Sequence, residues 1–350
     1  MKFKLKNLFF AILTITISTL LILLVCEGIF RLVNLNKNLK FLLVDQPGRK
    51  VGLYEYDENL GWKNRPNYER TFNWSYRETL EKINSKGLRD KEYTFEKDED
   101  VFRIAIIGCS RTYGYGVNME ETYSKELERL LNKTYPQKFE VINFGVNGYG
   151  LSQMTLNYLN NARKYSPDIV ILQLYLPTVF RASQTKMWGT QKPTYILKND
   201  ELVLINSPVP DDKFKPFEKW LIDKSNLYKF VKDKLLKIEE IQKLKFKDTV
   251  PQNEELHALT AKLLSYLNNE INKDNAQFIV FSWGTAEWLK DPLSVSGVEF
   301  FILEDYADFE SWKKIGNTEN PPPTGHWSPI GNQYVAESIF NYLTQTKLAQ

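Results

Sequence analysis

One serine in this 350-residue chain lies where a nucleophile could be built. Ser110 follows the apolar run Ile104–Ile107, which stops at Gly108, and a helical pattern begins after two more glycines. A strand that breaks on glycine can deliver a hydroxyl to a helix start, where backbone N–H groups and the positive end of the helix dipole suit a developing oxyanion. An ordinary strand-to-helix turn could have the same sequence. The interpretation as a nucleophile therefore depends on whether other segments supply a base and further oxyanion donors.

The choice of base is narrow because the sequence has two histidines. His257 lies inside a helical pattern, and we interpret it as an ordinary surface or core residue. His326 lies directly before the last helical pattern, where the alternative role is a structural N-terminal cap. A serine after the first strand of a parallel sheet and a histidine before its last helix can meet at one edge, as nucleophile and base do.

A second glycine-rich segment follows the second predicted strand. The segment Val141–Gly150 contains Gly145, Gly148 and Gly150, which permit close approach of backbone to a ligand. Glycine spacing in the chain fits neither a phosphate-binding loop nor a dinucleotide fingerprint. We therefore expect no cofactor.

The elements that must position these residues alternate between strand and helix. This alternation predicts an α/β fold, a three-layer α/β/α sandwich around a parallel sheet. An insertion is expected at about 178–251, with a hairpin around Asn199-Asp200 and a strongly charged, partly helical part. The predicted strands are Phe102–Gly108, Phe139–Phe144, Asp168–Leu176, Gln277–Ser282 and Glu299–Leu303; the predicted helices are Glu120–Lys133, Leu151–Tyr165, Asn253–Lys273 and one capped by Ser328.

The composition excludes several classes of protein. The net charge is +3 with acidic and basic residues interleaved, so a nucleic-acid partner is not expected. Cys26 lies in an apolar segment and Cys109 beside Ser110, so we expect neither a disulfide framework nor a metal site.

The N-terminus predicts a membrane anchor. Three lysines precede the uncharged segment Leu8–Cys26, which nearly reaches the length of a membrane-spanning helix. No small-residue cleavage site of a signal peptide follows. We expect residues 1–33 to be a cytoplasmic stub and a single-pass anchor, 34–100 a stalk and an N-terminal extension, and 101–346 an extracytoplasmic main domain.

In three ordered blocks the chain resembles the SGNH (GDSL-like) hydrolase family, specifically its membrane-anchored bacterial type. Gly108-Cys-Ser110 stands where the family has Gly-Asp-Ser, Val141-Ile-Asn-x-Gly with Gly148 matches the second block, and His326-Trp-x-Pro matches the last. The resemblance implies a flavodoxin-like sheet and an esterase in which Ser110 attacks and His326 is the base. It also implies an oxyanion hole from the N–H groups of Ser110 and Gly148.

The chain departs from this family at two supporting positions. Leu176-Pro177-Thr178 stands where the family carries an asparagine donor, and Thr324 and Pro323 stand where its acid is expected. Glu319 is our candidate acid, with Asp305 and Asp308 as further candidates. Asn147 or Thr178 could replace the missing oxyanion donor.

The three matching blocks and the two positions that differ from the family lead to two candidate functions. The first is an anchored serine esterase acting on a small ester or on O-acetyl groups of carbohydrate. The second is a catalytically degenerate member that binds carbohydrate or assists assembly. An O-acyltransferase is a third outcome of the same chemistry.

Overall fold

The computed structural model describes residues 2–33, 52–188, 190–210, 220–221, 224–228, 231, 254–284, 287–321 and 325–348. The chain divides into two compact units. One comprises residues 1–43, 50–52 and 211–251, and the other comprises 44–49, 53–210 and 252–350. The predicted charged part of the insertion lies largely outside the described residues.

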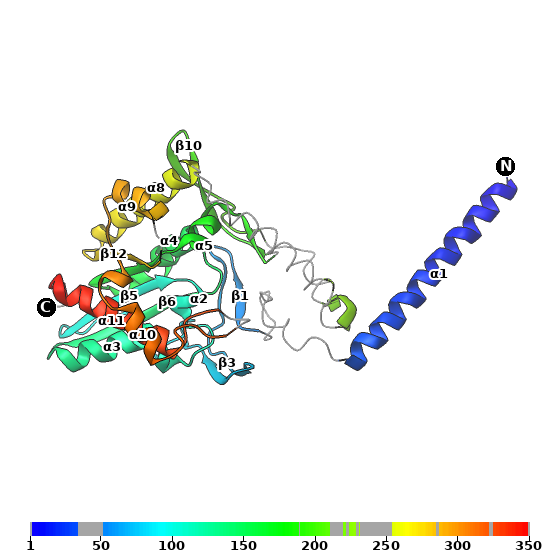
Figure 1. Cartoon of the computed structure of the whole chain (residues 1–350). Helices are drawn as coiled ribbons and strands as arrows, with labels where there is room; N and C mark the ends of the chain where they lie inside the picture. The colour runs from blue at the N-terminus through cyan, green and yellow to red at the C-terminus, as the bar shows by residue number, and fades with distance from the viewer. Residues whose placement is uncertain are drawn as a thin grey trace. The chain divides into compact units, whose positions relative to one another are not determined.

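The elements of the second unit follow the expected alternation (Figure 1). The strands are β1 (Tyr54–Asp57), β2 (Gly61–Asn64), β3 (Glu69–Asn73), β4 (Glu78–Lys82), β5 (Val101–Gly108), β6 (Lys138–Gly145), β7 (Ile169–Gln173), β8 (Lys186–Met187), β9 (Thr190–Gln191), β10 (Thr194–Lys198), β11 (Glu201–Ile205), β12 (Gln277–Ser282) and β13 (Glu299–Ile302). The helices are α2 (Ser110–Tyr113), α3 (Tyr123–Thr134), α4 (Leu151–Asn160), α5 (Leu176–Phe180), α8 (Glu254–Lys273), α9 (Glu287–Ser296), α10 (Phe309–Ile315) and α11 (Pro329–Gln345), with short 3₁₀ turns between some of them.

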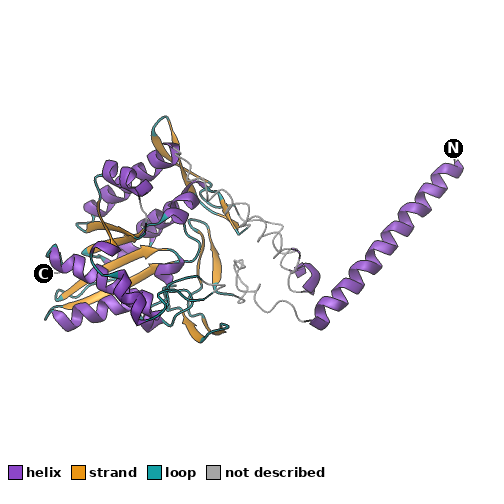
Figure 2. Ribbon diagram, viewed as in Figure 1, coloured by secondary structure: helices purple, strands orange, loops and turns teal. Residues whose placement is uncertain are grey.

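Five parallel strands form the central sheet, in the order β13-β12-β7-β5-β6 (Figure 2). Counted along the chain from β5, this is the order 2-1-3-4-5 of flavodoxin-like folds. The chain leaves β5 toward β6 on one side and later returns to β7 on the other. Ligands bind beyond the carboxyl ends of the strands at such a switch point. Ser110 comes two residues after the last residue of β5, at that edge.

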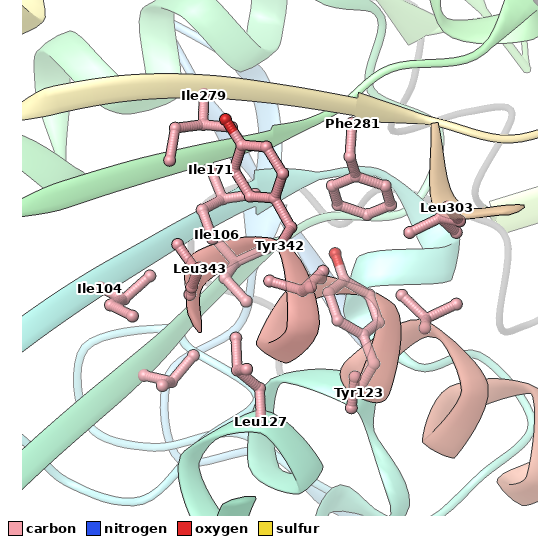
Figure 3. Packing of buried hydrophobic residues seen from close by; sticks show 14 of the residues in the cluster. Ile104, Ile106, Tyr123, Leu127, Ile171, Ile279, Phe281, Leu303, Tyr342 and Leu343 are labelled. Atoms are coloured by element: carbon pink, nitrogen blue, oxygen red, sulfur yellow. The ribbon is translucent and has the colours of Figure 1, made fainter. Parts of the chain in front are cut away.

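Helices cover both faces of the sheet. In β5 Ile104, Ala105, Ile106 and Ile107 are all fully buried, as a strand covered on both sides requires. On one face the side chains of the sheet pack against α3 and α11 (Figure 3). On the other face lie α4 and α8 (Figure 1). This packing fixes the strand ends on which the site is built.

Most predicted elements are confirmed, and three differ by more than one residue. The predicted helix Glu120–Lys133 begins as a 3₁₀ turn, and α3 starts at Tyr123. The predicted helix Leu151–Tyr165 ends its α-helical part at Asn160 and continues as a 3₁₀ turn. The predicted strand Asp168–Leu176 ends at Gln173, because Pro177 near the start of α5 fits a first helical turn and not a ladder. The hairpin around Asn199-Asp200 is present, with both turn residues at positive φ.

The N-terminal extension braces both glycine-rich loops. The buried Arg89 guanidinium donates hydrogen bonds to the carbonyls of Tyr113 and Gly114, at 2.9 and 2.7 Å. Trp62 Nε1 donates to the carbonyl of Asn147 at 3.0 Å. The loop after Ser110 and the loop before Gly148 are therefore both tied to residues that precede the sheet.

The N-terminal helix α1 runs from Lys2 to Val33 in the first unit. Among the residues that the structure describes, no helix is both long and apolar enough to cross a membrane.

Candidate active site

The turn that presents Ser110 depends on the absence of side chains at two strand ends. A Cβ on Gly108 would lie 1.9 Å from Thr112 Oγ1, and a Cβ on Gly145 would lie 2.2 Å from the Tyr113 nitrogen. The ends of β5 and β6 thus close around the short helix α2. Glycine at these positions lets the chain fold back directly after the strand, which places Ser110 at the first position of α2.

Ser110 and His326 meet at the sheet edge. The distance between Ser110 Oγ and His326 Nε2 is 2.8 Å, although the residues are 216 positions apart in the sequence. Both side chains are half-buried. This separation is within the range in which a histidine takes a proton from a serine hydroxyl.

The histidine loop is fixed by its own backbone. The Asn320 N–H donates to the carbonyl of His326 at 2.7 Å. Two residues later Ser328 caps α11, with its hydroxyl accepting from the Gly331 N–H at 3.1 Å, as the sequence predicts. The ring of Tyr115 lies 5.1 Å from the His326 ring, and burial raises the Tyr115 pKa above its usual range. Tyr115 is therefore a neutral neighbour of the base.

Arg111 links the serine helix to the histidine loop. Its Nη2 donates to Glu319 Oε1 and to the carbonyl of Gly325, both at 3.1 Å. The guanidinium lies over the rings of Trp283 and Trp327, at 5.3 and 5.0 Å. Arg111 thus holds the residue directly before His326, and Glu319 balances its charge.

Glu319 is accordingly engaged with Arg111, and its side chain is 55% exposed. Its role as the acid that orients the His326 ring stays a prediction. The structure places the further candidates Asp305 and Asp308 elsewhere in local turns: Asp308 caps α10 through hydrogen bonds from Glu310 and Ser311.

A buried polar cluster contacts the turn that carries Ser110. Gln173 Oε1, at the end of β7, accepts from Thr112 Oγ1 at 3.0 Å and lies 3.4 Å from the Cys109 nitrogen. The Cys109 thiol is fully buried and lies 3.6 Å from the same oxygen. The sequence analysis does not single out Gln173. Its polar side chain within an otherwise apolar strand is the feature that could have indicated a role near the site.

Gly148, which the sequence predicts as an oxyanion donor, lies in a tightly packed loop. Its φ is +81°, a left-handed conformation that favours glycine. The indole of Trp188, at the tip between β8 and β9, packs on it so closely that a Cβ on Gly148 would lie 2.4 Å from Trp188 Cη2. The other predicted donor, the Ser110 N–H, belongs to the first residue of α2 and so has no partner within the helix.

Two candidate replacement donors are already engaged. Asn147 Nδ2 donates to the Tyr54 hydroxyl at 2.6 Å, so one of its two N–H donors is committed to the N-terminal extension. The Thr178 hydroxyl donates to the carbonyl of Tyr175 at 2.6 Å. Both side chains are buried, 3% and 0% exposed.

The groups at this edge are the hydroxyl of Ser110, the imidazole of His326 and the backbone N–H of Ser110. Among the described residues, no cluster of three or more His, Cys, Asp or Glu side chains could hold a metal ion.

No family model matches the chain. No curated protein sequence matches it either. Similar solved structures are esterases. A two-domain esterase active on acetylated mannans is 14% identical over 71% of this chain and 50% of its own, with a TM-score of 0.40. A Clostridium thermocellum family 3 carbohydrate esterase is 17% identical over 71% of this chain and 100% of its own, with a TM-score of 0.39.

The esterase EstA from Pseudoalteromonas is 10% identical over 70% of this chain and 98% of its own, with a TM-score of 0.39. The chain spans half the length of the mannan esterase. These identities and TM-scores are low, so any functional inference has to stand on the geometry of the site.

Proposed function

We propose that this protein is an SGNH-type serine esterase whose nucleophile is Ser110 and whose base is His326. The observation that carries the proposal is the 2.8 Å contact between Ser110 Oγ and His326 Nε2 at the switch point of the sheet. A hydroxyl that faces an imidazole at this distance is arranged for proton transfer as the oxygen attacks a carbonyl carbon.

The steps follow from this geometry. Ser110 Oγ forms a bond to the ester carbonyl carbon while His326 Nε2 takes its proton. The N–H groups of Ser110 and Gly148 would hold the carbonyl oxygen as it becomes negative. Collapse breaks the bond to the alcohol, which leaves with the proton from His326. A water molecule, deprotonated by His326, then releases the acid from the serine.

The substrate class in this proposal is an acyl ester, including O-acetyl groups on carbohydrate, as the sequence resemblance implies. An acceptor hydroxyl in place of water in the second half would give an O-acyltransferase by the same steps.

A direct test compares the full-length protein with its Ser110→Ala variant on short acyl esters. We expect hydrolysis by the first and a loss of at least about 10³-fold in the second. Equal rates would overturn the proposal. A fluorophosphonate probe gives a second readout, because it should label Ser110 in the unaltered protein and fail to label the His326→Ala variant.

A catalytically degenerate binding protein is the second candidate. Two observations favour it. The Asn147 amide already donates to the Tyr54 hydroxyl, and the helix Leu176–Phe180 stands where the resemblance implies an asparagine oxyanion donor. Loss of one oxyanion donor costs about 10²–10³ in rate, so an enzyme lacking it would be slow. Labelling of Ser110 that depends on His326 would count against this candidate.

The location of the protein stays a prediction from its sequence. We propose, on the lysine-flanked apolar segment alone, that the main domain acts outside the cytoplasm. Cell fractionation followed by protease treatment of intact cells tests this. Recovery of the whole protein in the soluble fraction would contradict it.

A further inference from the structure

A continuous strip of aromatic rings leads away from the base. The ring of Tyr115 lies 5.1 Å from the His326 ring and 5.0 Å from that of Trp74. Trp74 is in turn 5.5 Å from Phe72 and 6.3 Å from Tyr76, measured between ring centroids. We call Tyr115, Trp74, Phe72 and Tyr76 the aromatic strip.

The rings of the hairpin part of the strip face the same way. Their planes are tilted by 22° between Phe72 and Trp74 and by 17° between Trp74 and Tyr76. Stacked carbons touch at about 3.5–4.0 Å, so nearly parallel rings at these larger centroid distances are offset sideways. All four residues of the strip are half-buried, so part of each stays accessible to a ligand.

Polar residues alternate with the aromatic ones. Thr71, Asn73 and Ser75 are exposed, but successive side chains of a strand point to opposite faces, so Thr71 and Asn73 lie on the face of β3 opposite Phe72. The guanidinium of Arg70 lies 4.6 Å from the Phe72 centroid at the outer end. The aromatic strip therefore combines apolar ring surfaces with the hydrogen-bond donors of Arg70 at its outer end.

The hairpin β3–β4 is held rigidly to the loop that follows Ser110. Arg77 Nη2 donates to the Glu121 carboxylate at 2.8 and 2.9 Å. The Leu80 N–H donates to Asn118 Oδ1 at 2.9 Å. Trp74 Nε1 donates to Thr79 Oγ1 at 2.8 Å, which orients its indole. A ligand on the strip would thus be held at a fixed position relative to the nucleophile.

We propose that the aromatic strip binds the sugar chain of a polysaccharide ester, so that its acyl group reaches Ser110. A sugar ring has a C–H face that packs on an aromatic ring and hydroxyls around its rim that need hydrogen-bonding partners. The rings offer the apolar surface and Arg70 offers hydrogen-bond donors at the outer end. The successive ring contacts run from His326 to that end of the hairpin. This inference rests on the proposed esterase function and names its substrate class.

The test uses Phe72→Ala, at the outer end of the strip, and Tyr76→Ser as a second variant in case the first disturbs the hairpin. Phe95→Ala is the matched control, because Phe95 is an exposed aromatic of the same extension outside the strip. The readout is KM for acetylated mannan and acetylated xylan divided by KM for 4-nitrophenyl acetate. We expect this ratio to rise about tenfold in the strip variants, since aromatic stacking contributes on that scale, and to stay unchanged in the control.

Binding is measured separately, so that failure of the strip and failure of the esterase can be told apart. In the Ser110→Ala background, the unaltered strip should retard migration through gels that contain acetylated polysaccharide, and Phe72→Ala should reduce that retardation. Equal retardation in both, or none with the unaltered strip, overturns the strip proposal even if small esters are hydrolysed. Binding through the strip without hydrolysis of any ester would instead leave the strip standing and overturn the esterase.

Discussion

The two sides of the candidate site differ in how complete they are. On the nucleophile side, Ser110 and His326 already lie in hydrogen-bond contact, and Arg111 ties their two loops together. On the oxyanion side, the Trp188 ring packs against Gly148, and the Asn147 amide is engaged with Tyr54. The proposed nucleophile and base are therefore already in contact, whereas the proposed oxyanion donor Gly148 lies in a loop against which a tryptophan packs.

The Ser110–His326 side and the Gly148 side of the candidate site depend on different parts of the fold. The nucleophile half is assembled by the sheet, since β5 and α11 bring its two residues to one edge. The oxyanion half is assembled by the N-terminal extension and by the β8–β9 hairpin, which lie outside the sheet. Substitutions on the two sides should therefore have different consequences.

The largest effect should come from the nucleophile side. Ser110→Ala and His326→Ala should each lower kcat for a short acyl ester by at least about 10³-fold, because the two residues act as one unit. The double variant should be no slower than Ser110→Ala alone. If kcat of the double variant instead falls by the product of the two single factors, the residues act independently, and Ser110 and His326 do not form one catalytic unit.

The next effect should come from Gly148→Ala. The new methyl group would clash with the Trp188 ring and would force a left-handed alanine, so the oxyanion loop must move. We expect kcat to fall by about 10²-fold, as for loss of one oxyanion donor. Adding Trp188→Ala should recover part of the loss by removing the clash. Unchanged kcat in Gly148→Ala would exclude Gly148 from the oxyanion hole.

Asn147→Ala should have a smaller effect on rate. The side chain of this residue bonds the Tyr54 hydroxyl, so its loss should lower the free energy of unfolding by about 1 kcal/mol and kcat by less than about tenfold. Tyr54→Phe is the matched control, since it removes the same hydrogen bond and leaves the amide. A hundredfold loss of kcat in Asn147→Ala alone would instead assign the amide to the oxyanion.

The smallest effect on catalysis should come from Lys192, which follows β9 at the base of the hairpin carrying Trp188. Its side chain is fully buried, Nζ has no hydrogen-bond partner among the described residues, and burial together with Arg181 lowers its pKa to about 7. Between about pH 7 and 10 the unfolded chain therefore binds a proton that the folded chain does not, so stability from this group rises with pH.

Lys192→Met should raise the free energy of unfolding at pH 7 by roughly 2 kcal/mol or more and flatten its rise toward pH 10. Denaturant unfolding at pH 7 and pH 9.5 measures both. The exposed Lys198, on the adjacent strand β10, provides the control substitution Lys198→Met, which should change neither. A loss of stability at pH 7 in Lys192→Met would mean that the ammonium has a stabilising partner.

Local patterns in the sequence predicted much of this arrangement. The apolar run before Gly108 predicted β5, and Ser328 with Pro329 predicted the start of α11. Parallel topology then placed Ser110 and His326 at a common edge.

Contacts between distant segments could not be predicted in the same way. The approach of Trp188 to Gly148 depends on a two-residue hairpin folding back over a loop 40 positions earlier, and no periodicity marks it. The engagement of Asn147 depends on Tyr54, which lies in a part of the chain without long periodic segments. Gln173 is the last residue of β7 and bonds Thr112 in the turn after Ser110. The apolar pattern predicts that this strand ends three residues later, so it does not mark Gln173 as a strand end.

The separation of Ser110 and His326 by 216 positions has a consequence for how the protein is made. Ser110 follows the first strand of the sheet and His326 precedes the last helix, so all five strands of the sheet are synthesised before the two residues can meet. A nascent chain that has folded its first strands carries an unactivated serine. The activity that we propose would then first appear when synthesis of the chain is complete, and not when its first half folds.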